Sequence, residues 1–203
     1  MYLYGASGHA KVIIEILESL NISVDGLFDD NPLIKALLGY PVFSAVSSQE
    51  TLMGDTIISI GNNEIRKNIS EKYLFRYANA IVHPRSCVSR RSKLNEGTVV
   101  MGHAIINIDT IIGKHVIINT SASVDHDCAV ENFAHIAPNA TLCGGVTVGE
   151  GSLIGAGAVI APNIKIGKWV TIGAGACVFR DVKDYSVVVG NPGRVRRKVL
   201  PDA

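Results

Sequence analysis

The amino-acid sequence predicts a small α/β domain followed by a parallel β-helix of six-residue repeats. From Val82 to Val178 every sixth residue is aliphatic, seventeen times in succession. A short fixed period of this kind indicates stacked coils that share one continuous core. Before Val82, strand-like and helix-like stretches alternate, which is typical of a parallel α/β unit. We therefore expect one domain over residues 1–80 and a second over residues 81–203.

The first domain contains three expected strands and two expected helices. The first strand covers residues 2–4, and apolar side chains with helical spacing follow from residue 12 to residue 20. Further strands are expected over residues 24–28 and 56–60, and the second helix over about 64–74. Ligands of such sheets bind beyond the carboxyl ends of the strands. We therefore expect this part to be a Rossmann-like binding domain.

Each of these strands ends in residues suited to a phosphorylated ligand. The first leads into a Gly-rich turn that opens a helix, where backbone N–H groups and the helix dipole favour phosphate. The second ends in two aspartates that can accept hydrogen bonds from a base or ribose, and the third ends in a Gly-Asn-Asn turn followed by an arginine. The candidate substrate-binding residues are Gly5, Ser7, Gly8, His9, Asp29, Asp30, Gly61, Asn62, Asn63 and Arg66.

The repeats favour short strands, because an amphipathic helix would need an apolar residue every three or four positions. Three hexads make a triangular coil of eighteen residues. Small side chains two positions before most of the aliphatics permit tight corners, and Val116, Val146, Ile164 and Val170 are the larger exceptions. Gly or Asn directly after the aliphatic, as at Gly113 and Asn119, is expected to adopt positive φ. No long insertion interrupts the repeats, so we expect the first domain to close the site.

Composition narrows the function classes. A net charge of +1 gives no electrostatic footprint for nucleic acid. No apolar run reaches the roughly 18 residues of a membrane span, and the start of the sequence has no secretory-signal pattern. Four scattered cysteines without CxxC spacing are interpreted as small buried thiols. We therefore expect a cytoplasmic protein that binds small molecules.

One histidine stands between two carboxylates. His126 follows the inward-facing Val124 by two residues and is flanked by Asp125 and Asp127, and Gly144 comes one coil later. Imidazole titrates near neutral pH, which suits a general base, and an adjacent carboxylate raises its basicity. A glycine stacked beside it leaves a notch whose amide can face an oxyanion. The candidate catalytic residues are His126, Asp127 and Gly144, with Asp125 as the alternative to Asp127.

The chain resembles the hexapeptide-repeat nucleotide-sugar N-acetyltransferases of the bacillosamine pathway and the related sialic acid O-acetyltransferases. The resemblance rests on residues 5–9 (GASGH), 28–30 (FDD), 60–66 (IGNNEIR), 119–121 (NTS) and 125–128 (DHDC). It implies a left-handed β-helix, a homotrimer, a UDP-sugar in the first domain and acetyl-CoA between subunits. At position 127 the family carries Glu, and the Asp of this chain is one methylene shorter.

The resemblance also implies further site residues. Asn119 and His135 match family residues near the substrate. Two glycine turns one coil apart suit an extended pantetheine, and the ending at residues 190–194 resembles the Gly-x-Pro-Ala-Lys ending of hexapeptide acetyltransferases. We expect the histidine and these turns to lie along one face of the prism. The candidate acetyl-CoA residues are Gly144, Gly155, Ala156, Gly157, Ala161, Gly173, Gly175, Arg180, Asn191, Pro192 and Arg194.

Three hypotheses follow for the function. The first is acetyl transfer from acetyl-CoA to the 4-amino group of a UDP-4-amino-4,6-dideoxy-N-acetyl-hexosamine. The second is O-acetylation of a sialic-acid-type sugar, and the third is a non-catalytic nucleotide-binding scaffold. A zinc enzyme is not expected, because His103, His126 and His135 lack the spacing of a three-histidine site. We therefore predict an acetyltransferase without a metal.

Overall fold

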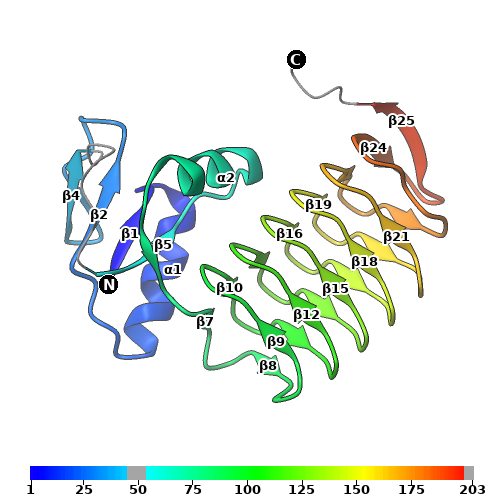
Figure 1. Cartoon of the computed structure of the whole chain (residues 1–203), viewed down its shortest axis with the longest axis horizontal. Coiled ribbons are helices and arrows are strands. Elements are labelled where there is room, and N and C mark those ends of the chain that lie inside the picture. The colour runs from blue at the N-terminus through cyan, green and yellow to red at the C-terminus, as the bar shows by residue number, and fades with distance from the viewer. Residues whose placement is uncertain (45–53, 199–203) are drawn as a thin grey trace.

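The computed structural model describes residues 1–44 and 54–198. In Figure 1 the α/β domain lies beside the first coils of a β-helix, whose later coils stack away from it toward the C-terminal end. Both parts of the predicted fold are present, and the parallel β-helix is confirmed.

The α/β domain is built on a six-stranded sheet with the order β3-β4-β2-β1-β5-β6. All its neighbours are parallel except the hairpin of β3 and β4, which the sequence analysis missed together with β6. Its elements are β1 (Tyr2–Tyr4), α1 (Gly8–Ser19), β2 (Gly26–Asp29), β3 (Ala36–Leu37), β4 (Tyr40–Ser44), β5 (Asp55–Ile58), α2 (Asn63–Lys72) and β6 (Arg76–Tyr77).

The β-helix has three sheets, one for each side of a triangular coil. The first contains β7 (Ile81–Val82), β10 (Val99–Val100), β13 (Ile117–Ile118), β16 (His135–Ile136), β19 (Leu153–Ile154), β22 (Thr171–Ile172), β24 (Ser186–Val189) and the antiparallel β25 (Arg194–Lys198). The second contains β8 (Cys87–Val88), β11 (Ile105–Ile106), β14 (Ser123–Val124), β17 (Thr141–Leu142), β20 (Val159–Ile160) and β23 (Cys177–Val178). The third contains β9 (Lys93–Leu94), β12 (Ile111–Ile112), β15 (Ala129–Val130), β18 (Thr147–Val148) and β21 (Lys165–Ile166).

Each strand of the prism pairs with the strand eighteen residues further on, so Val124 stands beside Leu142. The repeat aliphatics fill the interior, and Val124, Leu142 and Ile160 are all 0% exposed. Burying one such side chain is worth roughly 1.5–3 kcal/mol, so the ladder of aliphatics supplies the main stabilisation of the stack.

Three rows of turns connect the sheets, and we name them by the sheets they join. The first corner, between the first and second sheets, contains the turns 119–121, 155–157 and 173–175. The second corner, between the second and third sheets, contains 125–127, 143–145 and 161–163. The third corner returns to the first sheet and contains 113–115, 131–133 and 149–151.

The third residue of each turn adopts positive φ, as at Ser121, Asp127 and Phe133. The expectation that the glycine directly after the aliphatic has positive φ is wrong. A Cβ on Gly155, at such a position, would lie 2.5 Å from the Ile172 carbonyl oxygen of the next coil. These glycines are therefore required by the close approach of stacked backbones.

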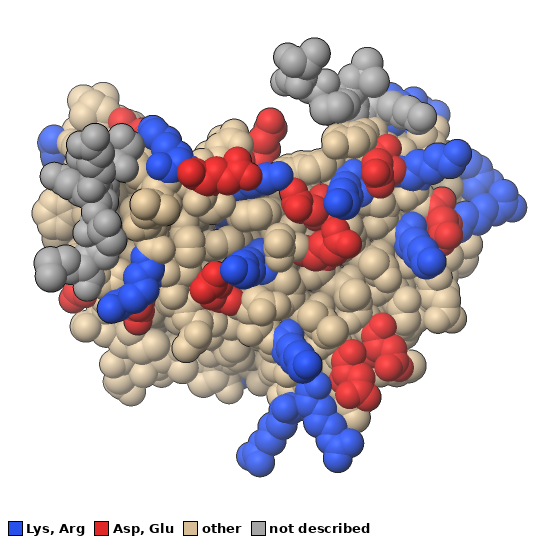
Figure 2. Space-filling view, in the orientation of Figure 1, with Lys and Arg blue, Asp and Glu red and all other residues tan. Residues whose placement is uncertain are grey.

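The α/β domain shares a core with the outer face of the first sheet. Leu3, Ile13 and Leu17 pack in one buried cluster with Val99 and Ile117. In Figure 2 acidic and basic side chains are interspersed over most of this view of the molecule. Within the described ranges, no helix has the length and apolar character needed to cross a bilayer.

Candidate active site

His126 lies in the second corner, in the turn between β14 and β15. Its Nδ1 is 2.7 Å from Oδ2 of Asp127, whose φ of 58° turns the carboxylate back toward the ring. This hydrogen bond, assisted by the charge of Asp125, raises the pKa of His126 above its usual value. When Asp127 accepts from Nδ1–H, the other ring nitrogen keeps its lone pair. The pair therefore has the form of a general base with an orienting carboxylate.

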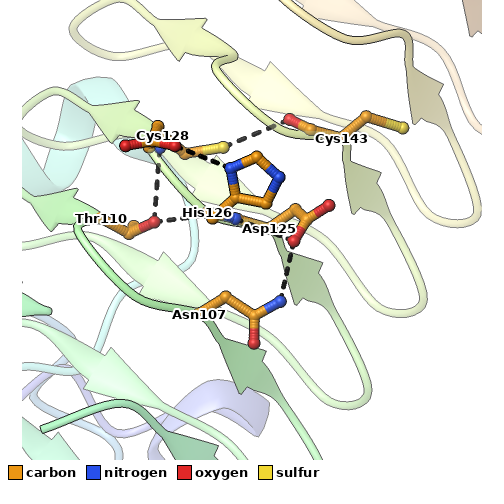
Figure 3. Close-up of polar contacts among 7 residues, drawn as sticks. Asn107, Thr110, Asp125, His126, Cys128 and Cys143 are labelled. Carbon is orange, nitrogen blue, oxygen red and sulfur yellow. Dashed lines mark hydrogen bonds and ion pairs between the residues drawn. The ribbon is translucent and has the colours of Figure 1, made fainter. Parts of the chain in front are cut away.

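Asp125 holds the backbone of the same turn. Its Oδ1 accepts hydrogen bonds at 2.8 Å from the backbone N–H of His126 and from Nδ2 of Asn107, one coil away (Figure 3). The bond from Asn107, followed by that from His126, lowers the pKa of Asp125. Thr110 supports the turn from below, donating at 2.8 Å to the Asp125 carbonyl. Asp127 therefore bonds the imidazole of His126, whereas Asp125 bonds the backbone N–H of His126.

Gly144 provides the notch beside the imidazole. A Cβ at this position would lie 2.7 Å from Cε1 and 2.8 Å from Nε2 of His126. Within the described part of the chain, the Gly144 amide has no hydrogen-bond acceptor. A pocket of about 370 Å³ opens here, lined by Asp125, His126, Asp127, Cys143, Gly144, Gly145, Pro162 and Asn163. The base and a free backbone donor therefore face the same space.

The predicted Gly-rich turn lies at the carboxyl end of β1. Gly5 has a φ of 107°, and Ser7 is the N-cap of α1 without using its side chain as a cap. Asp29 braces this turn, because its Oδ2 accepts from the Ala6 N–H at 2.7 Å. Asp30 accepts from the Tyr4 hydroxyl at 2.8 Å. Both aspartates lie where a ligand of this sheet would bind, although Asp29 already bonds the backbone.

A second cluster joins the α/β domain to the first sheet. Nε2 of His135 lies 2.9 Å from Nδ2 of Asn119, and the Gly61 backbone lies close enough to the His135 ring to raise its pKa slightly. Burial, and then the charge of Arg66, lowers the pKa of His135 to about 4. Burial and Arg66 likewise lower the pKa of His9 to about 4. The predicted residues of the substrate cleft are therefore brought together around neutral imidazoles.

Three of the predicted cleft residues are engaged in internal contacts. Arg66 is 1% exposed and, among the described residues, donates only to neutral acceptors, including the carbonyls of His115 and Phe133. The Asn63 side-chain amide donates to the Gly151 carbonyl at 3.0 Å, and Asn62 caps α2 by accepting from the Ile65 N–H. The sequence analysis placed Arg66 in the substrate cleft; in the structure its N–H groups bond the backbone carbonyls of the protein itself and the Asn63 side chain.

The coenzyme candidates divide between two corners. Gly155–Gly157 and Gly173–Gly175 lie in the first corner, and the Gly157 and Gly175 positions are open, because a Cβ added at either would have no neighbouring atom within 4 Å. Ala161 and Arg180 lie in the second corner, above the His126 pocket. Beyond the last coil come Asn191, the cis-linked Pro192 and the exposed Arg194.

The histidine and the glycine turns therefore lie at different corners, at the two edges of the second sheet. His126, Asp127 and Gly144 occupy the second corner, whereas Asn119 and the glycine turns occupy the first, and His135 projects from the first sheet between the first and third corners. The eighteen-residue coil dictates this division. The predicted catalytic residues and the predicted glycine turns therefore lie on two different edges of the prism.

Sequence reasoning missed Asn107 and Thr110, which support the His126 turn. Their signal was their spacing, since they precede Asp125 and Cys128 by one coil of eighteen residues. Among the described residues, no group of three or more His, Cys, Asp or Glu side chains is arranged to hold a metal ion.

Comparisons with known proteins agree with this architecture. Residues 1–73 match the family described as PglD N-terminal domain, and residues 145–180 match the bacterial transferase hexapeptide family. The acetyltransferase domain of PglB from Neisseria gonorrhoeae is 33% identical, with a TM-score of 0.86 over 96% of this chain and 98% of that one. PerB from Caulobacter crescentus, solved with CoA and GDP-perosamine, is 33% identical, with a TM-score of 0.87 over 97% and 96%.

One relative of known activity is similar to this chain over only part of its length. Serine acetyltransferase from Bacillus subtilis is 31% identical over 122 residues, which are 56% of this chain and 46% of that protein. The chain therefore spans about half the length of this relative. By contrast, the similarity to the PglB domain and to PerB extends over nearly all of each chain and joins both domains in the same order. The chain belongs to the PglD-like family of hexapeptide-repeat acetyltransferases.

Proposed function

We propose that this protein transfers the acetyl group of acetyl-CoA to the 4-amino group of a nucleotide-linked 4-amino-4,6-dideoxy sugar, with His126 as the general base. The observation that carries the proposal is the His126–Asp127 pair facing the free Gly144 amide across one pocket. The near full-length similarity to PerB, which was solved with CoA and GDP-perosamine, supports this substrate class. We propose a UDP-sugar as the substrate, and a GDP-sugar is the second candidate.

The proposed chemistry is a direct transfer. The sugar nitrogen attacks the thioester carbonyl while Nε2 of His126 accepts a proton from that nitrogen. Asp127 stabilises the imidazolium through the 2.7 Å contact with Nδ1. The Gly144 amide donates to the oxyanion of the tetrahedral intermediate. The carbon–sulfur bond then breaks, and the proton passes from His126 to the CoA thiolate.

The charges around His126 favour an amine over a sugar acid. Asp125 and Asp127 both line the pocket, and neither forms an ion pair with Lys or Arg among the described residues. The cationic form of an amine is attracted to two carboxylates that no Lys or Arg neutralises among the described residues, whereas the carboxylate of a sialic acid is repelled by them. This asymmetry supports N-acetylation over the alternative O-acetylation.

We also propose that the active unit is a homotrimer with its sites between subunits. In one chain the His126 pocket lies in the second corner, while Asn119 and the glycine turns lie in the first. A cyclic assembly in which the second corner of one copy faces the first corner of the next would complete every site.

A substrate panel tests the proposal. Thiol release from acetyl-CoA is measured with UDP- and GDP-linked 4-amino sugars, with their 4-hydroxyl counterparts and with free sialic acid. We expect release with an amino sugar and a loss of at least about 100-fold in His126→Ala. Release with hydroxyl acceptors alone would establish O-acetylation instead. If His126→Ala matches the wild type with every acceptor, the scaffold hypothesis is favoured.

A further inference from the structure

The guanidinium of Arg66 is a buried cation that no carboxylate neutralises within the described residues. Its side chain is 1% exposed, and burial lowers its pKa to about 9. An isolated charge at such a site is costly unless dipoles and hydrogen bonds replace its hydration. The residues around the guanidinium must therefore supply hydrogen-bond acceptors in place of water.

The contacts come from both domains. Nε donates to the His115 carbonyl at 2.8 Å and one terminal nitrogen to the Phe133 carbonyl at 2.7 Å, both in the third corner of the β-helix. The other terminal nitrogen donates to the Ile60 carbonyl at 2.9 Å, at the carboxyl end of the α/β sheet. Asn63 Oδ1 accepts at 2.9 Å. A single planar fork thus ties the Ile60–Asn63 turn to two successive coils.

The geometry of the prism explains why these carbonyls are available. His115, Phe133 and Gly151 are three successive positive-φ residues of the third corner, each one coil apart. Among the described residues, their carbonyls accept no backbone hydrogen bond from the neighbouring coils. Arg66 takes the first two, and Asn63, three residues earlier on the same face of α2, takes the third. The helix therefore docks by satisfying a row of unused acceptors.

The hydrogen bonds of Arg66 fix the orientation of the α/β domain, which the apolar contact between the domains does not. The shared core fixes the domain to the outer face of the first sheet near Val99 and Ile117. Hydrophobic packing is non-directional, whereas hydrogen bonds to a planar fork fix an angle. The Gly61 turn, held through Arg66, then meets the His135 ring.

From these contacts we propose that Arg66 is a positioning residue: it fixes the angle of the α/β domain on the β-helix and thereby places the Gly61–Asn63 turn against His135. The inference rests on the proposed function only for its kinetic consequence. The acceptor sugar must reach the acetyl-transfer pocket while its nucleotide is held by the α/β domain. A domain that tilts loses the bound nucleotide sugar but leaves the acetyl-CoA groove unaltered.

Three variants of the full chain test this inference. Arg66→Met removes the fork and the charge, and Arg66→Lys keeps the charge but not the fork. Lys67→Met is the matched control, because Lys67 is the next residue of α2 and its partly exposed ion pair with Glu150, at 2.7 Å, contributes little. Hydrogen exchange of residues 60–72, the KM of each substrate and the NMR titration of His135 are measured for all three.

We expect exchange at residues 60–72 to accelerate about tenfold or more in both Arg66 variants and to stay unchanged in Lys67→Met. The KM for the nucleotide sugar should rise about tenfold, with the KM for acetyl-CoA unchanged. The pKa of His135 should rise more in Arg66→Met than in Arg66→Lys, because only the former removes the charge. A purely structural role would raise both KM values together, so the difference between them is the readout that identifies a positioning role.

Wild-type exchange and an unaltered nucleotide-sugar KM in Arg66→Lys and Arg66→Met would overturn the inference. Equal rises in both KM values would also overturn it, because they indicate general loosening. If Arg66→Met does not fold, Arg66→Lys decides the question through the same exchange and KM measurements. If no nucleotide sugar is acetylated by the wild type, the proposed function fails, while hydrogen exchange still decides the role of Arg66.

Discussion

Replacing Gly144 by alanine tests the acetyl-transfer pocket with the addition of one methyl group. The new Cβ would lie 2.7 Å from Cε1 of His126, whereas ordinary contact begins at 3.4 Å. The imidazole must therefore retreat by at least 3.4 − 2.7 = 0.7 Å. Because the His126 side chain is 55% exposed, the ring is free to swing toward solvent.

The magnitude follows from that displacement. Moving a catalytic group by about 1 Å can cost about 100-fold in rate, so we expect kcat/KM to fall between about tenfold and 100-fold. Stability should change little, because Gly144 has no positive φ and the displaced ring lies at the surface. Replacing glycine at a permitted φ typically gains about 0.4–1 kcal/mol, which offsets the crowding.

Gly102→Ala is the matched control. Gly102 occupies the same place in its hexad and also lies beside a histidine, but a Cβ there would lie 3.6 Å from the His83 ring, an ordinary contact. Thiol release and the thermal midpoint are measured for both variants. A Gly144→Ala enzyme that keeps kcat/KM within twofold of the Gly102→Ala control would refute the assignment of this pocket as the reaction centre.

Three further predictions concern the pH dependence, the pocket charge and the stacking of the coils. In a pH–rate profile, kcat/KM should fall as the pH drops through the raised pKa of His126, because the base must be neutral to accept a proton. The Asp127→Asn variant should move this fall to lower pH, because it removes the carboxylate that raises the pKa. The Asp125→Asn variant keeps an acceptor for Asn107 but removes one negative charge from the pocket. Measured by calorimetry on the CoA-loaded enzyme, the affinity for the amino sugar should therefore fall about threefold to tenfold, and the affinity for its hydroxyl analogue should stay the same. Gly155→Ala should lower the thermal midpoint by several degrees in calorimetry, because its Cβ would meet backbone at 2.5 Å, and an unchanged midpoint would contradict the requirement for close approach.

The regular part of the fold was predictable because one physical rule repeats. An aliphatic at every sixth position fixes which side chain faces inward, and the structure buries Val124, Leu142 and Ile160 as expected. The α/β strands were found for a similar reason, with ends displaced by up to two residues. The strands β3 and β6 were missed because isolated strands of two residues carry no periodicity, and β4 (Tyr40–Ser44) was missed because it contains Pro41, which is atypical of strands.

The role of Arg66 was not predictable from its type. An arginine near a Gly-Asn-Asn turn suggests a cation for phosphate, and the sequence cannot show that carbonyls 49 and 67 residues away will surround it. Those carbonyls are free only because the corners of the prism leave them unpaired. Contacts of this kind depend on how the two domains dock, which no local pattern specifies.

The placement of the predicted site residues at different corners, by contrast, could have been predicted from the sequence. Residues whose numbers differ by a multiple of eighteen lie at the same corner. His126, Gly144 and Pro162 differ by whole coils and must share a corner, as Asn119, Gly155 and Gly173 must share another. Thirty-six residues separate Asn119 from Gly155, whereas only seven separate it from His126. Closeness along the chain therefore suggested one groove, although seven residues carry the chain across one side of the prism. Because the histidine and the glycine turns lie at different corners of one prism, the proposed function places the complete site between neighbouring copies.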